Sequence, residues 1–173
     1  MSSARELEQA LDVHMNNGSF YHALRIAEQL REETPDDPFI WLKYAQLKSL
    51  LGNFEYAIQE LKKLTKEHGG FVHGWHNLSA MLVSKGRFVD AEKALRVAIR
   101  LDPSDATVWQ NLGYVFYRTN RTKAAIRAFR RSLKIEPSVF AWHNLGRIHE
   151  NEGDMIKASK AYAECERLGG LGI

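Results

Sequence analysis

Three asparagines recur at matched positions in this sequence and could together bind a peptide backbone. Asn77, Asn111 and Asn144 each stand in the pattern Trp-x-Asn-Leu, one copy in each of three successive segments. A side-chain amide offers both a donor and an acceptor, so it can pair with a peptide backbone whatever side chains the peptide carries. The row predicts recognition of an extended chain. The alternative, that asparagine is merely frequent at this place of a repeated motif, stays open.

A second group combines aromatic side chains with arginines. Tyr114 and Tyr117 project from a helical segment whose core-facing positions are filled by other residues, and Arg118 follows them. Phe140 and Arg147 come from the next matched segment. Aromatic surface beside arginine is typical of binding hot spots. The group predicts a protein or peptide ligand with apolar and acidic character.

Histidines are the only residues whose spacing suggests a metal. His73 and His76 are three residues apart, which places them on one face of a helix, and this spacing suits a shared ion. No acidic residue or cysteine stands beside them, so we expect a polar wall of a binding surface and no metal.

Catalytic signatures are absent from the sequence. It has no glycine-rich phosphate loop, nucleophile elbow or paired-carboxylate motif. Cys165 is the only cysteine, which leaves no internal disulfide framework. We therefore expect a protein that is not an enzyme and uses no cofactor.

Two amphipathic helices must position the aromatic group. The first helix carries one face at positions i, i+3, i+4 and i+7, which are Trp109, Leu112, Gly113 and Phe116. The second carries a face at i, i+4 and i+7, which are Ala125, Phe129 and Ser132. Asn120 can take the left-handed conformation that ends a helix. The pattern predicts a helical hairpin in which Gly113 faces Ala125.

The same hairpin recurs along the chain. Its small second-helix residue returns every 33 or 34 positions, as Ala23, Ala57, Ala91, Ala125 and Ala158. The turn residue keeps the same rhythm, as Gly18, Gly52, Gly86, Asn120 and Gly153. The chain is predicted to be an array of five repeats.

The period and the residues resemble the tetratricopeptide repeat, whose signature is W-x2-L-G-x2-Y, A-x3-F, P. The resemblance covers nearly the whole chain and implies an all-α fold, an α-solenoid of five antiparallel helix-turn-helix repeats in a right-handed superhelix. We expect a single domain over residues 1–173, with repeats at 4–37, 38–71, 72–105, 106–138 and 139–168 and a short tail at 169–173.

In this family the first helix of each repeat lines the concave groove, where partners commonly bind. The resemblance therefore implies that the partner-binding residues are Phe39, Leu42, His73, His76, Asn77, Asn111, Tyr114, Tyr117, Arg118, Phe140, His143, Asn144 and Arg147.

The bulk composition fits a soluble protein. Its 173 residues are 45% hydrophobic, yet no apolar run approaches the roughly 18 residues that span a bilayer. No signal peptide is visible at the start, so a cytoplasmic location without a transmembrane segment is the simplest expectation.

Charge is unevenly distributed although the net charge is only +3. Residues 1–37 hold eight acidic against three basic side chains, and residues 106–138 hold one acidic against seven basic. We expect a non-catalytic interaction module (adaptor, scaffold or chaperone-like) that binds a peptide or protein segment in its groove. The alternatives are a self-assembling scaffold that uses the charged ends and nucleic-acid binding through the basic fourth repeat, which lacks interleaved aromatic residues.

Overall fold

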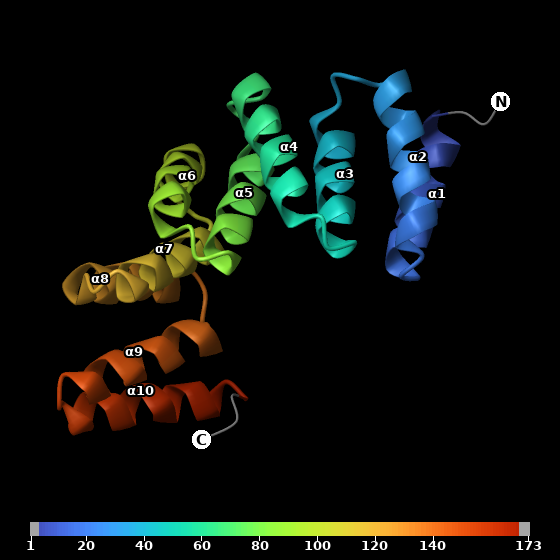
Figure 1. Cartoon of the computed structure of the whole chain (residues 1–173). Coiled ribbons are helices and arrows are strands. Elements are labelled where there is room, and N and C mark those ends of the chain that lie inside the picture. The colour runs from blue at the N-terminus through green and yellow to red at the C-terminus, as the bar shows by residue number, and fades with distance from the viewer. Residues whose placement is uncertain (1–3, 170–173) are drawn as a thin grey trace. The chain divides into compact units, whose positions relative to one another are not determined.

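Helix-turn-helix pairs make up the part of the chain that the structure describes, residues 4–169 of a computed structural model (Figure 1). The helices are α1 (Ala4–Asn16), α2 (Phe20–Glu33), α3 (Pro38–Leu50), α4 (Phe54–Glu67), α5 (Val72–Ser84), α6 (Phe88–Leu101), α7 (Ala106–Arg118), α8 (Thr122–Ile135), α9 (Val139–Asn151) and α10 (Met155–Arg167). No strand occurs within these residues. The predicted all-α class of paired helices is confirmed. Of the predicted tail, only Gly169 is among the described residues.

Local signals in the sequence fix where helices begin and end. Asp37 caps α3 by accepting the N–H groups of Phe39 and Ile40, and Pro38 is the first helical residue. Asp105 caps α7 in the same way. An N-cap carboxylate satisfies amide groups that the helix itself cannot pair. Asn120 ends the α7–α8 turn with a φ of 58°, which confirms the left-handed conformation expected there.

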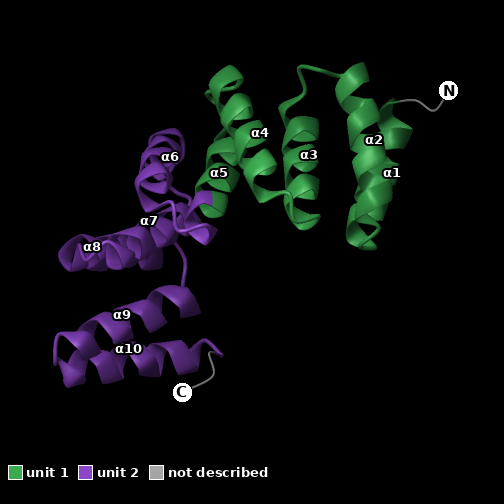
Figure 2. Cartoon of the chain, in the orientation of Figure 1, with its two compact units in different colours: residues 1–81 green, residues 82–173 purple. Residues whose placement is uncertain are grey.

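The chain divides into two compact units, residues 1–81 and residues 82–173 (Figure 2). The first unit has a core of buried aliphatic and aromatic side chains from α1 to α3, namely Leu11, Ala23, Ala27, Leu30, Ile40, Tyr44 and Leu47. Here α1 packs on α2, α2 on α3, and α3 on α4.

A buried carboxylate links three helices of the first unit. Glu60 on α4 is only 2% exposed. Its Oε2 accepts the Trp41 indole N–H at 3.0 Å and lies 3.1 Å from the Arg31 guanidinium. Lys63 Nζ lies 3.2 Å from Oε1. A buried carboxylate is tolerated when it is paired and hydrogen-bonded in this way.

The second unit has its core where α8, α9 and α10 meet, built from Ala125, Phe129, Ala141, Leu145, Ile148 and Ala161. Gly113 on α7 faces the Phe129 ring, since an added Cβ would lie 2.8 Å from its Cδ1. The atoms nearest to Gly113 belong to Phe129, one turn further along α8 than the Ala125 expected opposite it.

Candidate functional site

The aromatic and arginine side chains predicted as a binding surface lie together on α7 and α9. The Tyr114 and Phe140 rings are 5.8 Å apart. Arg118 Nη1 donates to the Tyr114 hydroxyl at 2.7 Å, and its guanidinium carbon is 5.0 Å from the centre of the Phe88 ring. Because Arg118 follows Tyr114 by four residues, one helix face carries both. Phe88, at the start of α6, is a member that the sequence argument missed.

A second aromatic–arginine contact continues the surface along α9. The guanidinium carbon of Arg147 is 5.7 Å from the centre of the Tyr117 ring. Asn151 Nδ2 donates to the Tyr117 hydroxyl at 3.3 Å. The five side chains Tyr114, Tyr117, Arg118, Phe140 and Arg147 are named here the α7–α9 patch.

The patch combines exposed aromatic area with two uncompensated charges. Phe140 is 41% exposed, and Arg118 and Arg147 are also exposed. Neither arginine forms an ion pair with an acidic side chain of residues 4–169. A guanidinium presents a planar fork of donors that matches a carboxylate. The patch can therefore bind a carboxylate next to an apolar group.

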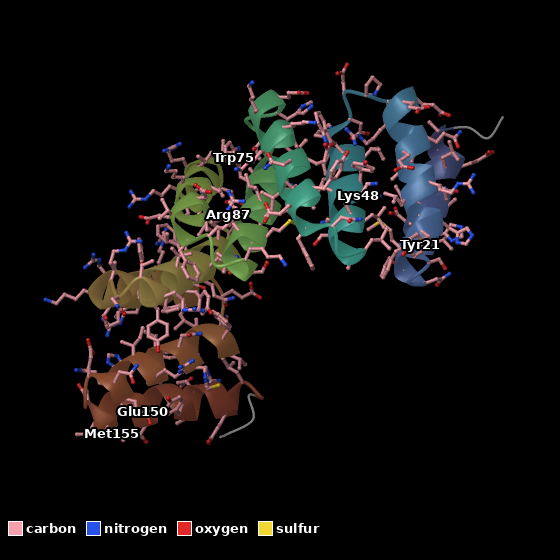
Figure 3. All side chains as sticks on the ribbon, viewed as in Figure 1. Tyr21, Lys48, Trp75, Arg87, Glu150 and Met155 are labelled. Carbon is pink, nitrogen blue, oxygen red and sulfur yellow. The ribbon has the colours of Figure 1, made fainter. Side chains whose placement is uncertain are left out.

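His143, on α9, contacts a tyrosine of α10. Its ring centre is 5.9 Å from that of Tyr162. Tyr162 donates to the carboxylate of Glu150, labelled in Figure 3, at 2.9 Å. Burial, together with this carboxylate, raises the pKa of Tyr162 to about 12, so the phenol stays neutral at pH 7. His143 and Tyr162 thus form a polar contact between α9 and α10.

The asparagine row is less available than the sequence suggested. Asn144 is 3% exposed, and its amide donates to the Phe140 carbonyl of its own helix at 2.8 Å. Asn77 donates to the His73 carbonyl at 2.9 Å and accepts from Gln46 at 3.0 Å. Asn111 is partly exposed, and its amide has no hydrogen-bond partner within the described chain. Only Asn111 offers an unused amide.

In the first unit the predicted residues form a small aromatic cluster. Phe39 is 55% exposed, and its ring centre is 4.9 Å from Phe71 and 6.0 Å from His73. Leu42 is buried, which removes it from the predicted surface. His76 is partly buried on the same helix as His73. Phe71, in the connection before α5, was missed because it precedes the helical pattern.

Among residues 4–169, no three His, Cys, Asp or Glu side chains come together as metal ligands. Within the same residues, none of the helices combines the length and the apolar character needed to cross a bilayer.

An ion-paired carboxylate lies between α6 and the start of α8. Glu92 accepts from Arg121 at 2.5 and 3.1 Å and from Arg96 at 2.7 Å. The Arg121 hydrogen bond is the main reason that the pKa of Glu92 lies below its usual range. Arg121 is thus already engaged within the protein.

Tetratricopeptide-repeat family models match three stretches that together cover most of the chain: residues 4–47, 81–140 and 141–168. The chain is 25% identical over 90% of its length to the tetratricopeptide repeat-containing protein trd-1 of Caenorhabditis elegans. It has the same identity and coverage with the human protein O-mannosyl-transferase TMTC1. It is 32% identical over 47% of its length to the peroxisomal targeting signal receptor of Saccharomyces cerevisiae. The chain spans 20%, 18% and 14% of these relatives' lengths.

The fold is also that of solved helical-repeat proteins. MamA from Desulfovibrio magneticus RS-1 superposes with a TM-score of 0.86 at 18% identity, covering 96% of this chain and 94% of that one. At this identity the likeness concerns the fold alone. Sequence period, paired helices and family matches agree, and the chain belongs to the tetratricopeptide repeat family.

Proposed function

We propose that this chain is a non-catalytic protein-interaction module that holds an acidic, apolar segment of another protein against the α7–α9 patch. Its family generally provides protein–protein interaction scaffolds. One relative, which matches about half of this chain, is named a receptor for a targeting signal, and this name supports a ligand-binding role. The proposal covers adaptor, scaffold and chaperone-like roles alike.

The observation that carries this proposal is the pair of uncompensated arginines held beside aromatic rings. Arg118 and Arg147 already contact Tyr114 and Tyr117, so their side chains are partly ordered before a ligand arrives. Ordering in advance lowers the entropy lost on binding. A carboxylate would gain a charge-assisted hydrogen bond, and an adjacent apolar side chain would cover Phe140.

The test is affinity capture from a native lysate with quantitative mass spectrometry, using the wild-type protein and two double variants. Arg118→Ala with Arg147→Ala removes both patch cations. Arg127→Ala with Lys134→Ala removes the same charge from exposed positions of α8. We expect partners of the wild type to be lost by the first variant and kept by the second. Equal recovery by both variants would show that the patch is not the binding surface.

Self-assembly is a second candidate, favoured by the opposite charges of residues 1–37 and residues 106–138. Attraction between such segments of different molecules is ionic and is screened by salt. The candidate therefore requires a mass in solution that rises with protein concentration at 50 mM salt and no longer does so at 500 mM. A constant mass at low salt removes it.

A further inference from the structure

A pocket of about 470 Å³ opens among α8, α9 and α10, and none of its lining residues belongs to the α7–α9 patch. Its apolar lining comes from Trp142, Leu145 and Ala161. Three cations also line it: Arg130 of α8 and Lys157 and Lys160 of α10. Pockets of this size, apolar with a few polar groups, are typical of ligand sites.

The charges around this pocket are not balanced within the protein. Glu164, the acidic lining residue, already pairs with Arg167 at 2.8 Å. Lys157 pairs with Asp154. Arg130 and Lys160 have no acidic partner within residues 4–169. The pocket therefore presents two uncompensated positive charges.

Trp142, a lining residue of the pocket, carries an unused hydrogen-bond donor. The indole N–H groups of Trp75 and Trp109 donate to loop carbonyls six residues earlier, Gly69 and Pro103, at 2.8 and 2.9 Å. That of Trp41 donates to Glu60. The Trp142 N–H has no such partner within the described chain.

A shortened loop accounts for this difference. The connection from α6 to α7 has four residues, 102–105, whereas that from α8 to α9 has three, 136–138. The proline carbonyl that serves Trp109 has its counterpart at Pro137, which is five and not six residues before Trp142. The deleted residue thus removes the acceptor at the place where Trp109 has one, and the Trp142 donor is left for a ligand.

We propose that this pocket is a second docking site, for a partner segment in which a bulky apolar side chain stands next to an Asp or Glu. The apolar side chain would pack on Leu145 and Ala161. The carboxylate would accept from the Trp142 N–H and face Arg130 and Lys160, which makes a charge-assisted contact in a partly apolar setting. The group that accepts the Trp142 hydrogen bond is thus a side-chain carboxylate inside the partner segment and not its terminal carboxylate.

Single-stranded nucleic acid fits this pocket less well than an acidic peptide. Nucleic-acid grooves use several aromatic side chains in succession for base stacking, and this pocket has one tryptophan. The single tryptophan therefore favours the peptide.

The experiment titrates an N-acetylated, C-amidated heptapeptide, DELFEDE, into the uniformly ¹⁵N-labelled full chain and follows the four indole N–H signals by NMR. Trp142→Phe identifies the signal of that residue. We expect the peptide to shift the Trp142 signal more than the other three. Arg130→Ala with Lys160→Ala should weaken binding at least tenfold. Lys123→Ala with Lys134→Ala, an equal charge loss on α8 outside the pocket lining, should change it less than twofold.

Several results would overturn the proposal. One is the absence of any Trp142 shift at 1 mM peptide. Another is equal affinity for DEGGEDE, which has no apolar side chain, since charge alone would then explain binding. Equal weakening by the two double variants is a third. A twelve-residue oligothymidylate that shifts the Trp142 signal more strongly than the peptide, or displaces it, would assign the site to nucleic acid. The α7–α9 patch shares no residue with the pocket, so the Arg118→Ala with Arg147→Ala variant tests that patch separately.

Discussion

Two serines are fully buried inside helices, and only one of them has a hydrogen bond. Ser79 Oγ donates to the His76 carbonyl at 2.7 Å. Ser132 Oγ, buried in the second unit, has no hydrogen-bond partner among residues 4–169. A buried hydroxyl without a partner keeps its desolvation cost and gains no hydrogen bond in return.

Replacing each serine by alanine should therefore change stability in opposite directions. Ser132→Ala removes an unsatisfied group and should raise the free energy of unfolding by about 1 kcal/mol. Ser79→Ala loses a satisfied bond and should leave stability unchanged or lower it by up to about 1 kcal/mol. Urea denaturation followed by circular dichroism measures both. A Ser132→Ala protein less stable than wild type would mean that its hydroxyl is satisfied after all.

The sequence predicts some side-chain contacts and not others. Its periodicity predicts that Tyr114, Arg118 and Phe140 are neighbours, because register along a helix follows directly from spacing. The spacing did not predict that the Asn144 amide donates a hydrogen bond to the Phe140 carbonyl of its own helix. That choice depends on rotamers and local packing, which a spacing pattern does not contain.

At the scale of helix pairs, repeats two to five each match a small residue on the first helix with a large residue on the second. Positions matched to Gly113 hold Ala45, Ser79 and Gly146, and positions matched to Phe129 hold Leu61, Leu95 and Tyr162. A glycine stands where the facing residue is aromatic: Gly113 against Phe129 and Gly146 against Tyr162. Alanine or serine is matched with leucine. Total volume at the crossing is thus conserved while its distribution changes.

This pairing predicts a rescue experiment. Gly113→Ala should destabilise the protein by about 1–3 kcal/mol, because the new methyl would overlap the Phe129 ring. Adding Phe129→Leu should recover part of that loss, since alanine with leucine is the pair used at Ala45 and Leu61. Thermal unfolding of the two single variants and the double variant forms a double-mutant cycle. Strict additivity would show that the two positions do not share the crossing.

The ion pair between α6 and the start of α8 predicts a pH-dependent contribution to stability. The pKa of Glu92 is lowered in the folded protein, so its paired carboxylate stabilises the fold above the unfolded value of about 4.3. That contribution is lost as the pH falls through the lower folded pKa. Arg121 is 42% exposed, which limits the contribution to about 0.5–1 kcal/mol.

Arg121→Gln should accordingly lower stability at pH 7, and its effect should diminish as the pH falls through the lowered pKa of Glu92. Urea denaturation of wild type and variant from pH 7 to pH 2 measures the difference. Arg100→Gln removes the same charge from an exposed position of α6 and serves as the control. A difference that persists unchanged at pH 2 would mean that Arg121 acts through packing, for example on the Phe116 ring 4.5 Å away.

For the whole molecule, the sequence predicts where the helices lie far better than whether the repeats unfold cooperatively. The 34-residue period, the turn residues and the Asp caps fix where helices lie, because these signals are local. Whether five repeats behave as the single domain expected over residues 1–173 depends on the energy of each repeat interface, which a period does not reveal. Contacts divide the chain at residues 81 and 82, inside α5 (Figure 2).

A boundary inside a continuous helix favours cooperative unfolding, because no flexible loop separates the two units there. We propose that the chain unfolds as one domain. Hydrogen exchange under native conditions tests this with Gly113→Ala, which lies in the second unit. In one cooperative domain the slowest amides of α3 and α8 should lose the same protection, since both exchange only through global opening. Reduced protection confined to α8 would instead assign separate stabilities to the units, and Ser79→Ala in the first unit should then leave α8 unaffected.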